Sequence, residues 1–145
     1  MKAVVQRVNS ASVEINNKLY SSIKSGILVL FCVEKNDSEQ NIDWFVKKIL
    51  SLRIFEDSQQ KMNLSVKDIQ GEILVVSQFT LAADCKKGSR PSFDNAELPQ
   101  RAEKLYEIFI QKLKMSDIPV QTGEFGAMMN VSLVNNGPVT FVLTQ

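Results

Sequence analysis

The N-terminal part of the chain carries short apolar runs that are typical of β-strands. The pattern predicts strands at residues 2–8, 12–15 and 19–23, with Asn16-Asn17 as the turn between the last two. Residues 27–33 form a continuous apolar run, which is typical of a strand covered on both faces. This part of the chain is therefore predicted to form a sheet.

Two later segments carry apolar residues at the spacing of three and four that indicates an amphipathic helix. The first opens at Asp37-Ser38, where Asp37 and Gln40 resemble a capping box. The second begins near Pro99 and ends before Pro119. The apolar stripes are Ile42, Phe45, Val46, Ile49 and Leu50 in the first helix, and Ala102, Leu105, Tyr106, Phe109, Ile110 and Leu113 in the second.

The remaining apolar runs predict short strands at 54–55, 72–78, 120–122, 128–135 and 139–143, with a polar loop at 56–63. Strands and helices that do not alternate strictly favour a mixed sheet over a doubly wound fold. We therefore predict a single α/β domain over residues 1–145. Its mixed, largely antiparallel sheet would form two β layers, barrel-like, with two main helices packed on one side.

The composition narrows the classes of function. With 145 residues, 44% of them hydrophobic, the chain can bury one core. Its 17 basic and 16 acidic residues argue against coating nucleic acid by bulk charge, although a local basic patch stays possible. Because there is no histidine and the two cysteines are far apart, we expect no metal site and no cofactor. No run is long enough to span a membrane, so we expect a soluble, cytoplasmic protein.

Ser77, Gln78, Phe79 and Thr80 form the most informative stretch, because they lie where a buried strand gives way to a basic loop. Hydroxyl and amide groups at the carboxyl end of a strand commonly build ligand sites. Two interpretations are open: these residues hydrogen-bond locally, or they form a cradle whose N–H groups bind a carbonyl. Without histidine, a hydrolase here would need a carboxylate, a lysine or the substrate itself as its base.

Three further segments are informative, and two of them have both a structural and a functional interpretation. Lys86, Lys87 and Arg90 form either a solvated loop or a phosphate-binding cluster. Residues 135–138 read as a hairpin turn, since Asn-Gly between apolar runs is a strong turn pattern. Residues 121–129, with two glycines, either line a pocket or form an ordinary connection.

Taken together, these motifs closely resemble the D-aminoacyl-tRNA deacylase family over the whole chain. The resemblance rests on the Ser77-Gln78-Phe79-Thr80 motif, on residues 88–93 and on residues 131–140 with their Gly137-Pro138 pair. It extends from residues 1–8 through 55–57, 61–65 and 122–127. The chain departs from the family at Gln60, where glycine is common, and at Asn136, where aspartate is common.

The resemblance implies a homodimer that hydrolyses the ester between a D-amino acid and the 3′-terminal adenosine of tRNA, and that rejects L-aminoacyl-tRNA. It implies a cis Gly137-Pro138 bond that reaches into the partner subunit's active site, where its carbonyl oxygens meet the substrate's amino group. Arg7 would hold this motif in place. The other implied pocket residues are Ser77, Gln78, Phe79 and Thr80, with Ala102 and Met129 nearby. Lys86, Lys87 and Arg90 become candidates for contacts to the tRNA.

The missing histidine fits this chemistry, because an aminoacyl ester is already activated and needs mainly positioning and oxyanion stabilisation. The backbone N–H groups of Phe79 and Thr80 are the candidate donors. Whether Thr80 also attacks as a nucleophile is open, and we favour attack by water assisted by the ribose 2′-hydroxyl. A site that rejects L side chains by clash would not exclude glycine, so glycyl-tRNA is an expected substrate.

Two other functions remain as alternatives. The first is an RNA-binding module without activity, which release of free D-amino acid would exclude. The second is a hydrolase of free D-amino-acid esters or amides, which would work equally well without the tRNA.

Overall fold

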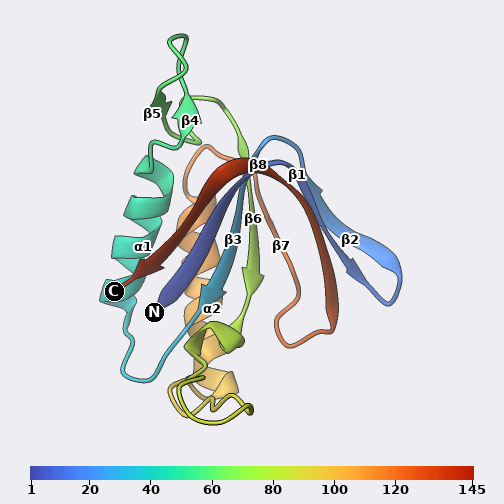
Figure 1. Cartoon of the computed structure of the whole chain (residues 1–145), viewed down its shortest axis with the longest axis vertical. Helices are drawn as coiled ribbons and strands as arrows, with labels where there is room; N and C mark the ends of the chain where they lie inside the picture. Colours follow the sequence, from blue (N-terminus) through green and yellow to red (C-terminus); the bar gives the residue numbers. More distant parts are fainter.

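A strongly bent mixed sheet organises the chain in the computed structural model, which describes residues 1–145 (Figure 1). Its strands run in the order β2-β1-β3-β6-β7, and β8 also pairs with β1. The β3–β6 and β6–β7 pairs are parallel, and the other pairs of this sheet are antiparallel. The strands are β1 (Lys2–Ile15), β2 (Lys18–Ile23), β3 (Gly26–Cys32), β6 (Glu72–Ser77), β7 (Val120–Thr122) and β8 (Met129–Thr144).

The two helices, α1 (Glu39–Ser51) and α2 (Pro99–Lys114), pack against one face of the sheet, as predicted. Their apolar stripes meet the sheet at Phe31, whose ring stacks on Phe109 at 4.0 Å and meets Phe45 edge-on at 5.5 Å. A smaller core on the other face lies between the sheet and the bent ends of β1, β2 and β8. These bent ends make the sheet nearly closed, so the predicted single α/β domain with a barrel-like mixed sheet is confirmed.

Several element boundaries differ from the prediction. The segments 2–8 and 12–15 are one strand, β1, and no hairpin interrupts the last strand, β8, at residues 135–138. The reason is that β1 and β8 pair along nearly their whole lengths, with register shifts around Val8 that bend both strands. The Asn-Gly pattern therefore marks a bend inside a strand. The predicted loop at 56–63 contains part of a small hairpin, β4 (Phe55–Glu56) and β5 (Met62–Leu64).

The capping box of α1 lies one residue later than predicted, at Ser38 and Asn41. Asp37 is instead committed elsewhere: its carboxylate accepts hydrogen bonds from the N-terminal ammonium of Met1 at 2.6 Å and from the Glu34 N–H at 2.6 Å. A residue that pairs across the fold cannot be told from a local cap by sequence spacing alone.

Candidate functional site

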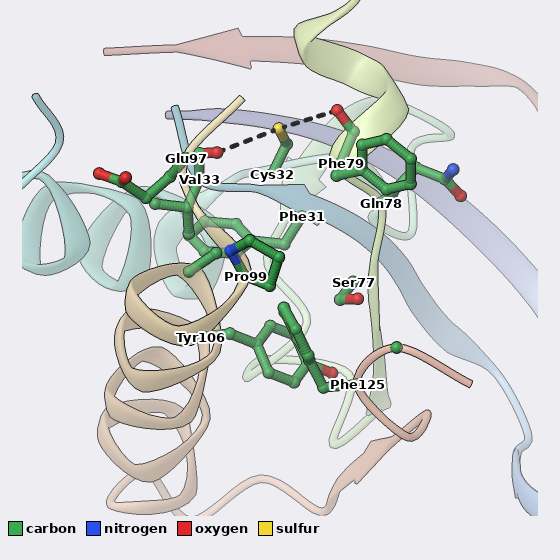
Figure 2. Close-up of a pocket in the computed structure, with 12 residues that line it drawn as sticks. Phe31, Cys32, Val33, Ser77, Gln78, Phe79, Glu97, Pro99, Tyr106 and Phe125 are labelled. Atoms are coloured by element: carbon green, nitrogen blue, oxygen red, sulfur yellow. Dashed lines mark hydrogen bonds between the residues drawn. The ribbon is translucent and has the colours of Figure 1, made fainter. Parts of the chain in front are cut away.

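A cavity of about 280 Å³ lies at the carboxyl ends of β3 and β6, between the 3₁₀ turn η1 (Phe79–Ala82) and the start of α2 (Figure 2). The predicted residues Ser77, Gln78 and Phe79 line it from one side, and Ala102 lines it from α2. Its other walls are largely aromatic and come from Phe31, Tyr106 and Phe125. Strand-end polar groups therefore border an apolar pocket.

The polar edge of the cavity is formed where β6 turns into η1. Thr80 is exposed and is not part of the cavity wall; its Oγ1 accepts a hydrogen bond from Gln78 Nε2 at 2.5 Å. The N–H groups of Phe79 and Thr80 are the first two of the turn, where no carbonyl of the same turn reaches them. These amides are thus available to an external acceptor.

The cavity wall contains no side chain that is ready to act as a base. Tyr106 donates its hydroxyl to the Val75 carbonyl at 3.0 Å, and burial raises its pKa. Burial also raises the pKa of the Cys32 thiol to about 11, and this thiol donates to the Phe79 carbonyl at 3.5 Å. Glu97 accepts the Leu98 N–H at 2.8 Å and pairs with Arg101, and these bonds hold the pKa of its carboxyl below the usual range.

The second predicted motif centres on Arg7, which is only 5% exposed. Its Nε and Nη2 donate to the carbonyl oxygen and Oδ1 of Asn136 at 3.1 and 3.2 Å, and its Nη1 donates to the Ile54 carbonyl at 2.7 Å. These bonds fix the backbone directly before Gly137, and the Gly137-Pro138 bond is cis, as the resemblance implied. Gly137 and Pro138 themselves are exposed.

The structure does not bring the two motifs together within one chain. Val8 of β1 pairs with Asn135 of β8 on one side and with Gly26 on the other, and Gly26 is the first residue of β3. Ser77, at the end of β6, pairs with Phe31 near the end of β3. Phe31 is five positions after Gly26, which is roughly 16 Å at the rise of a strand. The Arg7 motif and the cavity therefore lie at opposite ends of the sheet (Figure 1).

The remaining predicted residues divide between these places. Met129 packs into the smaller core beside Gly123, not into the cavity wall. Lys86, Lys87 and Arg90 are exposed on the loop after η1. That loop is closed by paired backbone bonds between Asp84 and Ser92 at 2.8 and 3.0 Å.

Sequence reasoning missed part of the cavity wall. Phe31 and Tyr106 read as core residues, because a stripe position facing a cavity has the same spacing as one facing other side chains. Glu97 carried no pattern at all. Phe125 and Gly126 belong to the glycine-containing segment that was expected either to line a pocket or to connect strands, and they line the pocket.

The structure gathers no group of three or more Cys, Asp and Glu side chains that could hold a metal ion. Neither α1 nor α2 combines the length and apolar composition needed to cross a membrane.

Comparison with known proteins gives consistent matches over the full chain. A family model described as D-Tyr-tRNA(Tyr) deacylase matches residues 4–144. The chain is 56% identical to a D-aminoacyl-tRNA deacylase of Thermosipho melanesiensis, over 99% of this chain and 96% of that protein. A solved structure described as "c-Myc DNA Unwinding Element Binding Protein" superposes with a TM-score of 0.95 at 43% identity, covering 100% and 99% of the two chains. A structure of a probable eukaryotic D-amino acid tRNA deacylase, at 18% identity and covering 98% and 97%, shares the fold with a TM-score of 0.80.

Proposed function

This chain belongs to the D-Tyr-tRNA(Tyr) deacylase family, and from that premise we propose that residues 1–145 form one deacylase domain. The domain is a carboxylic ester hydrolase. It cleaves the ester between a D-amino acid and the 3′-terminal adenosine of tRNA, and it releases free amino acid and tRNA. The observation that carries the proposal is the cavity beside the Phe79 and Thr80 amides, with the family's Ser77-Gln78-Phe79-Thr80 motif on its edge. The activity belongs to the cytoplasm, where aminoacyl-tRNA is made and used.

The terminal adenosine enters the cavity, and the ester lies at its polar edge. Aromatic walls from Phe31, Tyr106 and Phe125 suit a purine and a ribose, which bury apolar faces and keep their polar edges near the opening. With the adenosine seated in this way, the ester carbonyl falls next to the residues that end β6.

The N–H groups of Phe79 and Thr80 stabilise the negative oxygen that develops as the ester is attacked. One such donor typically contributes about 2.7–4 kcal/mol to the transition state. Because Cys32, Tyr106 and Glu97 are all committed, the attacking water is assisted by the ribose 2′-hydroxyl of the substrate. Thr80 acts through its backbone in this scheme, so Thr80→Ala should keep near-normal turnover. A trapped acyl-threonine would contradict it.

The enzyme works as a homodimer in which Gly137-Pro138 of one subunit enters the cavity of the other. Two features support this arrangement. The motif is exposed at the end of the sheet opposite its own cavity, and β8 exposes apolar side chains, with Val134 and Val142 at 54% and 69%. A second subunit would cover such side chains and bring motif and cavity together.

Chirality is then selected by three fixed directions around the substrate's Cα. The amino group meets the Gly137-Pro138 carbonyls, the ester meets the Phe79 and Thr80 amides, and the hydrogen faces the wall. An L side chain would collide with that wall, and a ten-thousandfold preference needs only about 5.5 kcal/mol. Ala102 belongs to the neighbouring wall, and Met129 supports the sheet behind it.

The exposed cations Lys86, Lys87 and Arg90 are the proposed contacts to the tRNA backbone on the subunit that binds the ester. Their loop is joined to η1 by the rings of Phe79 and Phe93, whose centroids are 5.1 Å apart. A phosphate bound by this loop would therefore lie near the ester.

The test is a set of deacylation assays with D-tyrosyl-, L-tyrosyl- and glycyl-tRNA. We expect fast release of D-tyrosine, measurable release of glycine and no release of L-tyrosine above the uncatalysed rate. Equal rates for both tyrosyl enantiomers would contradict the chiral site. If D-tyrosine stays on the tRNA, the alternative of an RNA-binding module without activity is favoured. If D-tyrosine methyl ester is hydrolysed as fast as D-tyrosyl-tRNA, the alternative of a hydrolase of free esters is favoured.

A further inference from the structure

A second group of cations lies far from the loop of Lys86 and Lys87, on a shallow groove of about 500 Å³ beside the end of α1. Lys47 contributes from the helix, Arg53 from the segment after it, and Lys67 from the segment after β5. Ser51 and Ser65 also line the groove, and Asp68 is its one acidic residue. Three positive charges thus meet one negative charge.

The charges of this groove are largely free to bind a ligand. Lys47 and Lys67 are exposed and take part in none of the six ion pairs of the chain. Asp68 is occupied, because its Oδ2 accepts bonds from the N–H and Oγ of Ser65, both at 2.7 Å. Arg53 donates from Nε and Nη2 to Asn63, and this fixes its guanidinium in place at the groove.

The groove lies at the same end of the molecule as the Gly137-Pro138 motif. Arg53 directly precedes Ile54, whose carbonyl accepts the Nη1 hydrogen bond of Arg7. Arg7 in turn holds the Asn136 backbone next to Gly137. The β4–β5 hairpin and the bend of β8 stand together at this end in Figure 1, opposite the cavity. The groove and the motif are therefore connected through Ile54 and the hydrogen bonds of Arg7.

From this placement we propose that the groove of Lys47, Arg53 and Lys67 binds acceptor-arm phosphates of a tRNA whose ester lies in the partner subunit's cavity. The inference rests on the proposed function, because it assumes that Gly137-Pro138 of one subunit enters the cavity of the other. The subunit that lends this motif also lends the groove. Each tRNA is then held from two sides, by the loop of Lys86, Lys87 and Arg90 in one subunit and by the groove in the other.

Two lysines provide the cleanest variant, because Lys47 and Lys67 make no hydrogen bond or ion pair that the fold needs. We expect Lys47→Ala/Lys67→Ala to lower kcat/KM for D-tyrosyl-tRNA about tenfold near 0.1 M salt. The slope of log kcat/KM against log salt should become shallower by about 0.7–0.9 for each lost phosphate contact. The readout is the ratio of this kcat/KM to that for D-tyrosyl-adenosine, which carries no phosphates. The matched control is Lys18→Ala/Lys24→Ala, which removes the same charge from the two ends of β2, where Lys18 begins the strand and Lys24 directly follows it.

Mixed dimers test whether the groove acts across the interface. One subunit carries Lys47→Ala/Lys67→Ala with its cavity intact. The other keeps its lysines, and its cavity is filled by Ala102→Phe, or by Ala102→Met if the first variant does not fold. Acting across the interface, the intact groove serves the intact cavity, so the purified mixed dimer should regain close to half of the wild-type activity. If the groove instead serves the cavity of its own subunit, the intact groove of the mixed dimer is paired with the filled cavity, and the activity of the mixed dimer would stay low.

Three outcomes are decisive. A changed tRNA-to-adenosine ratio together with recovery in the mixed dimer supports the proposal. An unchanged ratio, or a loss equal to that of the Lys18 and Lys24 control, overturns the groove as a tRNA site, and a loss without recovery overturns its action across the interface. Failure of the proposed function looks different, because the wild type would then release no amino acid from D-tyrosyl-tRNA or would hydrolyse D-tyrosyl-adenosine equally well.

Discussion

At the scale of residues, Arg7 and Arg53 make nearly the same hydrogen bonds in opposite surroundings. Each donates from Nε to an asparagine carbonyl oxygen and from Nη2 to the same asparagine's Oδ1. Arg7 is buried and also donates to the Ile54 carbonyl, whereas Arg53 is exposed. A buried guanidinium cannot exchange a lost partner for water, so the same geometry has a different energetic weight at the two positions.

The first prediction compares Arg7→Lys with Arg53→Lys. An ammonium cannot form the three bonds of the Arg7 guanidinium at once, so Arg7→Lys leaves the buried Ile54 carbonyl or the Asn136 acceptors unpaired and should lower the free energy of unfolding by about 2–4 kcal/mol. Arg53→Lys should cost less than about 0.5 kcal/mol, because water replaces the lost bonds. Urea unfolding followed by circular dichroism measures both values. D-tyrosyl-tRNA turnover should fall for Arg7→Lys, and equal losses of stability in the two variants would refute the assigned weight of burial.

The two cysteines give a second prediction at this scale. Burial raises the pKa of Cys32 to about 11, whereas Cys85 is exposed on the loop after η1. At pH 8 only about 0.1% of Cys32 would be thiolate, so iodoacetamide should modify Cys85 and leave Cys32 intact in the folded protein. Peptide mass spectrometry after timed labelling, with and without urea, measures this, and D-tyrosyl-tRNA hydrolysis should survive the labelling. Early modification of Cys32 in the folded protein would contradict its burial.

The same shift has a consequence for stability. The fold favours the neutral thiol of Cys32, because its pKa is above the unfolded value of 9.0. This contribution is complete below pH 9 and is lost as the pH rises toward 11. Cys32→Ala should therefore flatten the decrease in unfolding free energy over that range, which urea titrations at each pH can follow.

At the scale of elements, the parallel β3–β6 pair positions the cavity, and Gly26 sets how closely the two strands approach. A Cβ at Gly26 would lie 1.9 Å from the Glu72 backbone oxygen, whereas a Cβ at Gly88 meets nothing within 4 Å. Gly26→Ala should therefore separate the strands and cost more than about 3 kcal/mol of unfolding free energy. Gly88→Ala, which has only a positive φ of 67° to accommodate, should cost about 1 kcal/mol. Thermal and urea unfolding of the two variants measures the difference between their losses of unfolding free energy. Equal losses would show that β3 and β6 have room to shift and that Gly26 does not set their spacing.

Apolar spacing was sufficient to predict both helices and most strands, because each helix stripe and each strand run faces the core. It failed where an element is decided by distant pairing. Asn136 and Gly137 read as a turn, but β1 pairs with β8 on both sides of them and keeps the strand continuous. Asp37 read as a cap, but the N-terminal ammonium lies within 2.6 Å of it. Both partners are more than thirty residues away in sequence, where no local pattern extends.

At the scale of the whole molecule, the sequence identified both motifs of the proposed site, and only the family resemblance implied that they meet across subunits. The Ser77-Gln78-Phe79-Thr80 motif and the Gly137-Pro138 motif are recognisable from their residues alone. Their distance is set by the register of β1 on β3 and β8, which places Val8 beside Gly26 and leaves Phe31 beside Ser77. Because one chain cannot join these ends, the proposed function requires that a second subunit supply part of the site.

The last prediction follows from that separation and concerns enzyme concentration. If the cavity needs Gly137-Pro138 from a second subunit, an isolated subunit binds adenosine but cannot hold the amino group, and it should be nearly inactive. The rate per subunit should then fall on dilution with the same midpoint as the dimer-to-monomer transition measured by sedimentation or mass photometry. Both D-tyrosyl-tRNA and D-tyrosyl-adenosine should lose activity, because dissociation removes the site that both esters share. Adding an excess of the Ala102→Phe subunit, whose own cavity is filled, should restore activity to the diluted wild type. A constant rate per subunit through the transition would mean that one chain is sufficient, and the cross-subunit site would have to be abandoned.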